Sequence, residues 1–184
     1  MQPILDVAFT TYYIGLVPLK VAKFSKTQIN LAAVIVDMQD SLLAQILQKD
    51  QLIQAQVDVL NSCARYDIPV AVLQYSSQGN TTAQIEAALE NVPRKDYFWK
   101  QKNDGFSNNL FANKLRQWDV NALLFMGISA SYCVQATAES ALRNNYKIFT
   151  SEQLISDNSG LTASAKRWYK ENGIFVQDYK QIIK

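Results

Sequence analysis

Three uninterrupted apolar runs constrain the fold of this 184-residue chain most: LAAVIV at 31–36, VAVL at 70–73 and ALLFM at 122–126. Short apolar runs without alternation are typical of strands that are buried on both faces, as in a parallel sheet. Pro69 introduces the second run and Gly127 closes the third, so both have clear ends. The sequence therefore predicts a sheet with helices on both faces.

Helical and extended segments alternate along the rest of the chain. Further strands are expected at 97–100, 147–150 and 174–176, and helices are expected within 52–60, 85–89, 110–118, 131–144 and 161–171. Strands that alternate with helices imply right-handed crossovers. We predict one α/β domain over residues 31–184, with three α/β/α layers and a mostly parallel, doubly wound sheet of six strands. Residues 1–30 lie outside the alternation and form an N-terminal extension of uncertain structure.

Composition gives no support for several classes of partner. The chain is 48% hydrophobic and 18% charged, which suits a domain with a real core. A formal net charge of +2 gives no reason to expect nucleic acid or an anionic membrane as a partner. The apolar stretch Ala8–Leu19 is about half the length of roughly 20 residues that a membrane-spanning helix needs. Two distant cysteines do not make a disulfide framework, so we expect a reducing, cytoplasmic setting.

The sequence contains no histidine. A Ser-His-Asp triad and a Cys-His dyad are therefore excluded. The commonest protein ligand of zinc and iron is also missing, and we expect neither a metal site nor a cofactor. A nucleophile in this chain must be activated by something other than imidazole.

Three reactive residues follow predicted strands: Asp37 after the first, Lys100 after the third and Cys133 just after the fourth. Ligands and reactions gather at the carboxyl ends of strands in open parallel sheets. Each residue alone has a plain alternative, since polar residues often begin loops and cysteines often serve as small hydrophobes, as we expect for Cys63. Cys133 is expected in the first turn of a helix, where free N–H groups would lower its pKa and could hold an oxyanion.

The motifs around these residues resemble the isochorismatase-like hydrolases. LAAVIVDMQ at 31–39 resembles the first-strand motif of that family, an apolar strand followed by Asp-Met-Gln. Lys100 and Phe106 in KQKNDGF are similar to the family's Lys and the Phe six residues later. GISASYCVQATAESA at 127–141 is similar to its nucleophile motif. The order and approximate spacing of all three motifs are kept over about residues 31–180.

The resemblance implies a hydrolase that cleaves a small amide, carbamoyl or related acyl substrate. Cys133 would attack the carbonyl and form a thioester, Asp37 would be the general base, and Lys100 would stabilise both. A cis peptide at Ile128–Ser129 would shape an oxyanion hole with the N–H groups of Ser129 and Cys133. Isochorismatases that cleave a vinyl ether typically lack the cysteine. Nicotinamidases of the family hold a metal through an Asp and two His, and this chain cannot form that pocket.

Four residues could bind the small-molecule substrate: Gln39, Trp99, Phe106 and Tyr132. For the three aromatic residues, a role in packing alone is an equal alternative. For Gln39, the alternative is a side chain that faces solvent. The chain departs from the family at Ala130, where Thr is usual, and after Phe106, where it reads Ser-Asn-Asn. We also expect a homo-oligomer, as is common in the family. The competing hypotheses are a non-catalytic oligomeric module that retains the fold and, more weakly, a thiol-based redox protein.

Overall fold

A parallel sheet forms the centre of the protein in the computed structural model, which describes residues 28–183. Its seven strands are β1 (Leu31–Val36), β2 (Val70–Tyr75), β3 (Lys95–Lys100), β4 (Ala122–Ile128), β5 (Lys147–Ser151), β6 (Ile155–Ser156) and β7 (Ile174–Val176). The strand order is β3-β2-β1-β4-β5-β7, and β6 pairs with the end of β4. Every pairing is parallel, as the uninterrupted apolar runs predict.

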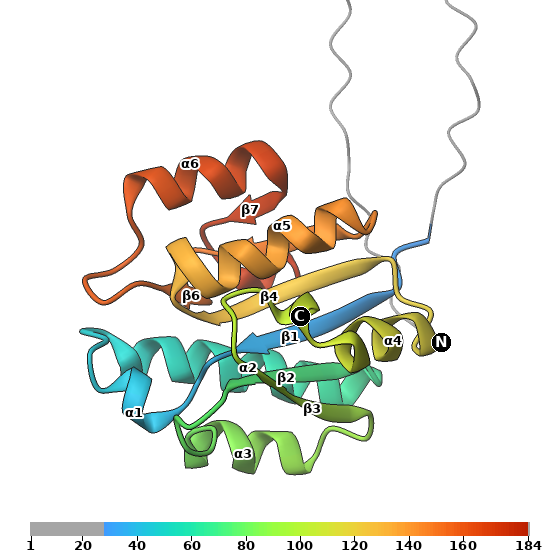
Figure 1. Ribbon diagram of the computed structural model, residues 1–184, viewed down its shortest axis with the longest axis horizontal. Helices are drawn as coiled ribbons and strands as arrows, with labels where there is room; N and C mark the ends of the chain where they lie inside the picture. The colour runs from blue at the N-terminus through green and yellow to red at the C-terminus, as the bar shows by residue number, and fades with distance from the viewer. Residues whose placement is uncertain (1–27, 184) are drawn as a thin grey trace, which may run out of the picture.

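Helices cover both faces of this sheet (Figure 1). The α-helices are α1 (Asp40–Leu43), α2 (Lys49–Tyr66), α3 (Ala83–Glu90), α4 (Asn109–Gln117), α5 (Gln135–Arg143) and α6 (Ala163–Asn172). Shorter turns are η1 (Gly105–Ser107), η2 (Ala130–Val134) and η3 (Tyr179–Gln181). Helices α2 and α3 pack on one face, and α4, α5 and α6 pack on the other. The predicted three-layer, doubly wound α/β fold is therefore confirmed.

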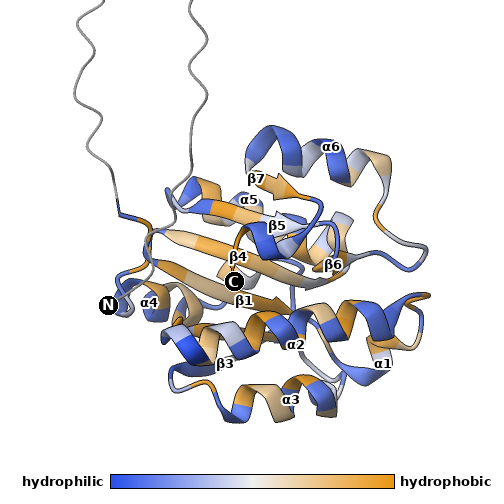
Figure 2. Cartoon of the chain, turned by 180° about the vertical axis from the view of Figure 1, so that it is seen from behind, coloured by the Kyte–Doolittle hydropathy of each residue, from blue (hydrophilic) through white to orange (hydrophobic). Residues whose placement is uncertain are grey.

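Alternate residues of each central strand point to opposite faces and fill two separate cores. In β1, Ala33 and Ile35 face α2, whereas Ala32, Val34 and Val36 face α5. The strands are the most apolar part of the molecule, and the helices mix apolar and hydrophilic residues (Figure 2). Burial on both faces explains why the strands read as continuous apolar runs.

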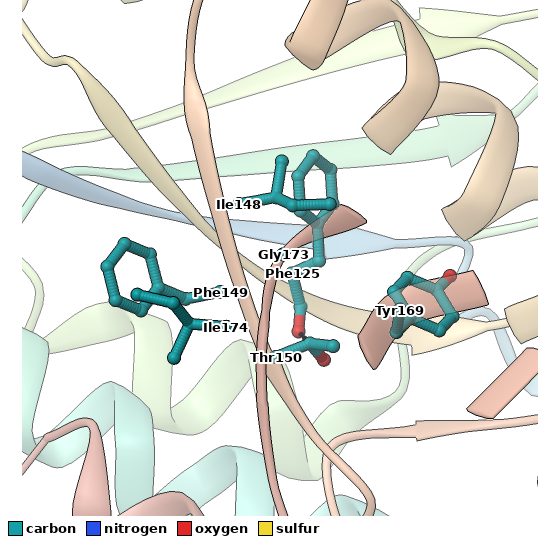
Figure 3. A pocket seen from close by; sticks show the side chains of 7 residues that line it. All are labelled: Phe125, Ile148, Phe149, Thr150, Tyr169, Gly173 and Ile174. Atoms are coloured by element: carbon teal, nitrogen blue, oxygen red, sulfur yellow. Dashed lines mark hydrogen bonds between the residues drawn. The ribbon is translucent and has the colours of Figure 1, made fainter. Parts of the chain in front are cut away.

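Close packing continues to the far edge of the sheet. Side chains from β4, β5 and the segment around the end of α6 meet there (Figure 3), and the space between them has no room for a water molecule. A Cβ at Gly173 would lie 2.4 Å from Cγ1 of Ile148, so the absence of a side chain lets the chain leave α6 close against β5.

Three details differ from the sequence prediction. The sheet has seven strands instead of six, because β6 has only two residues and leaves no visible periodicity. Residues 40–43 form the short helix α1, which was not predicted from the sequence. The helix expected over 131–144 begins as the π-helical turn η2 and becomes α-helical only at Gln135. Strand β1 begins at Leu31, as predicted, whereas the Ala8–Leu19 stretch lies outside the described residues.

No helix within residues 28–183 is long and apolar enough to cross a membrane.

Candidate active site

Asp37 and Lys100 form a buried ion pair at the carboxyl edge of the sheet. Asp37 directly follows β1, and Lys100 is the last residue of β3, two strands away. Lys100 Nζ lies 2.7 Å from Asp37 Oδ2, and the two side chains are 0% and 3% exposed, respectively. The long lysine side chain thus spans the intervening strand β2. Burial costs each charge its hydration, and the pairing offsets that cost.

Asp37 has two unusual features. Its φ of +55° lies in the left-handed region, which a residue other than glycine adopts only when its surroundings hold it there. Its second oxygen, Oδ1, is buried without a hydrogen-bond partner among the described residues. Desolvation raises the pKa of Asp37 above its usual value, although the Lys100 charge opposes the rise. Such a carboxylate is disposed to take up a proton.

Cys133 reaches the same edge of the sheet through a tight turn after β4. Strands β4 and β1 are neighbours, as the predicted doubly wound order requires. Gly127 has φ +136°, and a Cβ there would lie 2.1 Å from the carbonyl oxygen of Val36, so only glycine fits. The Ile128–Ser129 peptide is cis, as the family resemblance implies. The chain then enters η2, which contains Cys133.

The Cys133 thiol interacts with both members of the ion pair. Burial and the Asp37 charge raise the pKa of Cys133 to about 11, although Lys100 lowers it in part. The predicted lowering of this pKa by a helix N-terminus is therefore wrong, because burial and a neighbouring carboxylate outweigh it. The thiol also donates a hydrogen bond to Asn103 Oδ1 at 3.7 Å. Burial therefore favours the neutral thiol form of Cys133 beside the Lys100–Asp37 pair.

This arrangement suits transfer of a single proton from sulfur to carboxylate. Burial raises the pKa values of both groups; Asp37 raises the pKa of Cys133 further, whereas the hydrogen bond with Cys133 lowers the pKa of Asp37. The two groups therefore titrate as one coupled unit with Lys100 beside them. A thiol that loses its proton to an adjacent base at the moment of attack needs no low pKa of its own.

Side chains that the sequence prediction missed hold the nucleophile turn in place. Asp157, just after β6, accepts hydrogen bonds from Ser131 N at 2.9 Å and Ser131 Oγ at 2.6 Å. Thr137 is fully buried, donates to the Cys133 carbonyl at 2.7 Å and accepts from Gly105 N at 2.9 Å. Thr137 therefore ties the loop after Lys100 to the turn that contains Cys133. Only the Thr-Ala of the nucleophile motif hinted at this role.

The predicted substrate-binding residues lie in different surroundings. Tyr132 adjoins Cys133 and is 66% exposed. Phe106 is half-buried and packs edge-on against Phe111, with ring centroids 4.9 Å apart. Trp99 is 49% exposed and neighbours Lys100 in the strand, so its side chain points to the opposite face of the sheet. The structure does not bring Trp99 together with the catalytic candidates.

Gln39 is fully buried, so the solvent-facing alternative is wrong. Its Nε2 donates to the carbonyl oxygens of Tyr75 at 2.9 Å and Gly79 at 2.6 Å, and its Oε1 accepts from Tyr75 N at 2.7 Å. Both amide hydrogens are thereby used. The side chain holds the end of β2 and the turn that follows it.

The candidate site offers no metal ligands of the kind that a His-containing pocket would use. Histidine is absent from the sequence, and residues 28–183 contain no group of three Asp, Glu or Cys side chains placed to hold an ion. The residues present do not fit the Asp and two His metal pocket of nicotinamidases.

Comparison with known proteins identifies related folds. A family model described as an isochorismatase domain matches residues 32–168. MAR1 ribonuclease from Caenorhabditis elegans superposes with a TM-score of 0.73 at 17% identity, covering 83% of this chain and 79% of that chain. N-carbamoylsarcosine amidase from Thermoplasma acidophilum superposes with a TM-score of 0.68 at 20% identity, covering 82% of this chain and 96% of that chain. The ycaC gene product of Escherichia coli is described as an octameric hydrolase of unknown specificity. It superposes with a TM-score of 0.71 at 16% identity, covering 83% of this chain and 77% of that chain. No curated protein sequence matches the chain.

Proposed function

Because the chain belongs to the isochorismatase family, we propose that it is a cysteine hydrolase that cleaves a small amide, carbamoyl or related acyl substrate. The observation that carries the proposal is the half-buried Cys133 thiol beside the buried Asp37–Lys100 pair, in which 2.7 Å separates the carboxylate from the ammonium. The three residues come from separate parts of the chain, and a structural role alone gives no reason for a thiol to join a buried ion pair.

In the proposed reaction, the Cys133 sulfur attacks the acyl carbon while Asp37 takes the thiol proton. The carbonyl π electrons move to oxygen, and the resulting oxyanion is held by the N–H groups of Ser129 and Cys133. Collapse of this intermediate breaks the C–N bond, and Asp37 gives its proton to the leaving nitrogen. A thioester on Cys133 remains.

Water completes the cycle. Asp37, again a carboxylate, removes a proton from a water molecule that attacks the thioester carbonyl. The acid product leaves and the sulfur recovers its proton from Asp37. Lys100 stays charged throughout and stabilises first the carboxylate and then the thiolate.

Substrate contacts are proposed for Tyr132 and Phe106, which belong to the nucleophile turn and to the loop after Lys100. We leave Gln39 and Trp99 out, because the first is committed to backbone groups and the second lies on the other face of β3. We also propose a homo-oligomer, since one protein of similar fold is described as octameric. Cys133 requires a reducing setting to stay a thiol, which favours the cytoplasm.

Intact-mass spectrometry tests the function directly. The protein is mixed with a panel of small amides and carbamoyl compounds, and an acyl adduct together with release of ammonia or amine is expected for at least one of them. Cys133→Ala serves as the control and should show neither. A non-catalytic module of the same fold would give no adduct with any acyl compound and no product, even over long incubation.

A further inference from the structure

Tyr75 places its aromatic ring against the Lys100 ammonium. Tyr75 ends β2 and is the register partner of Lys100 in the adjacent strand β3, so their side chains lie on the same side of the sheet. Lys100 Nζ is 4.6 Å from the centre of the Tyr75 ring. This distance is well within the range in which the negative face of a ring attracts a cation.

The surroundings of Lys100 make the ring important. The side chain is fully buried, and an ammonium group has three hydrogens to donate. Its hydrogen bonds to oxygen within the described residues go to Asp37 Oδ2 at 2.7 Å and to the carbonyl of Lys102 at 3.3 Å. The second of these is long. The ring covers a side of the ammonium that water would otherwise have to solvate.

Hydrogen bonds hold Tyr75 both at its backbone and at its hydroxyl group. The Gln39 carboxamide accepts from the Tyr75 N–H at 2.7 Å and donates to the Tyr75 carbonyl at 2.9 Å, in the manner of a neighbouring strand. The Tyr75 hydroxyl donates to the carbonyl of Gln101, the residue after Lys100, at 2.9 Å. Gln39 thus acts on the site through Tyr75, which gives its buried side chain a role.

We propose that Tyr75 is a positioning residue of the catalytic centre: its ring, fixed by Gln39, holds the Lys100 ammonium between Asp37 and Cys133. The proposal rests on the proposed function only in taking Lys100 as part of the triad. Without the ring, the ammonium gains room to move away from the sulfur and to draw in water. The Lys100 charge lowers the pKa of Cys133, so its displacement should raise that pKa further.

Alkylation of Cys133 by iodoacetamide measures this effect without any substrate. The full chain is compared with Tyr75→Phe, which keeps the ring and loses the hydroxyl, and with Tyr75→Leu, which loses both. Mass spectrometry follows the rate from pH 6 to pH 10. We expect Tyr75→Phe to stay near wild type, and Tyr75→Leu to react about three- to tenfold more slowly at neutral pH, as loss of a cation–π contact with a half-buried ring implies.

A series of fluorinated phenylalanines at position 75 separates electrostatics from shape. Fluorine withdraws charge from the ring face and changes its size little, so alkylation should slow stepwise from Phe to difluoro- to tetrafluorophenylalanine. An equal rate across the series would overturn the proposal, and so would a wild-type pH profile for Tyr75→Leu. Should Tyr75→Leu not fold by circular dichroism, the fluorinated series decides alone.

The outcome is independent of hydrolase activity. A graded slowing together with no acyl adduct on any substrate would remove the proposed function and keep the role of Tyr75. Equal alkylation rates across the fluorinated series, in a chain that forms acyl adducts, would remove the role of Tyr75 and keep the proposed function.

Discussion

Replacing Lys100 by methionine tests how much the buried ion pair contributes to the stability of the folded protein. Methionine keeps most of the length of the side chain and removes its charge. The partner carboxylate is 2.7 Å away, and its side chain is only 3% exposed, so water cannot take over its solvation. Breaking a buried pair by removing one partner costs about 3–5 kcal/mol, against about 1 kcal/mol or less for an exposed pair.

The loss should depend on pH. Burial already raises the pKa of Asp37 in the presence of Lys100, and removal of the cation raises it further. A carboxyl group with a higher pKa in the folded than in the unfolded chain binds more protons when folded, so its contribution to stability falls as pH rises. The variant should therefore lose most stability at neutral pH. It should approach the wild type as pH falls below the pKa of Asp37 in the folded variant.

Urea unfolding followed by circular dichroism, at a series of pH values from 4 to 8, measures both effects. Adding Asp37→Asn to Lys100→Met removes the orphaned charge and should restore part of the lost stability at neutral pH. A loss below about 1 kcal/mol at pH 7 would mean that the pair behaves as an exposed one. A loss that is the same at every pH would refute the assignment of the cost to the Asp37 charge.

Four further predictions follow from the site and the fold. Iodoacetamide should label Cys133 before Cys63, because Cys63 is fully buried with a pKa raised to about 12, and the Cys133 rate should climb with pH toward about 11; equal rates would contradict this. Incubation with a chelator should leave hydrolysis unchanged, since a pocket of the Asp and two His kind cannot form; activity restored only by added zinc or manganese would show the opposite. Light scattering at micromolar concentration should give a mass above that of one 20.8 kDa chain, and a monomer mass would count against self-association. Gly127→Ala should destabilise the protein by more than about 3 kcal/mol, whereas Gly79→Ala, also at positive φ but with open space around it, should cost about 1 kcal/mol; similar losses would refute the close approach to Val36.

The sequence predicts the sheet well because periodicity and burial are local properties. Each strand buried on both faces reads as an apolar run, and the alternation with helices restricts the topology. The two-residue strand β6 and the four-residue helix α1 are too short to show a period. The position of Trp99 could have been foreseen, since it precedes Lys100 in a strand and must face the other way.

The candidate site is less predictable, because its properties depend on residues far apart in the chain. The partners of Gln39 are Tyr75 and Gly79, 36 and 40 residues away, and no local pattern announces them. The pKa of Cys133 is a balance of burial, one carboxylate and one ammonium. The direction of the shift follows only from the positions of these groups in space. A helix N-terminus expected from the sequence is therefore not enough to predict it.

The charge balance of the cluster explains how it could work without histidine. Before attack in the proposed reaction, the site holds the buried Lys100 ammonium and Asp37 carboxylate and the half-buried Cys133 thiol in its neutral form. After the thiol proton moves to Asp37, it holds the same ammonium, a neutral acid and a thiolate. The net charge of the three groups is zero in both states, so the step does not add a charge to a poorly hydrated region. A neutral imidazole in place of Asp37 would instead create an ion pair from two neutral groups. In the proposed reaction Lys100 makes the difference, because one fixed positive charge stabilises whichever neighbour is negative. The proposal requires the ammonium to stay between oxygen and sulfur throughout the reaction.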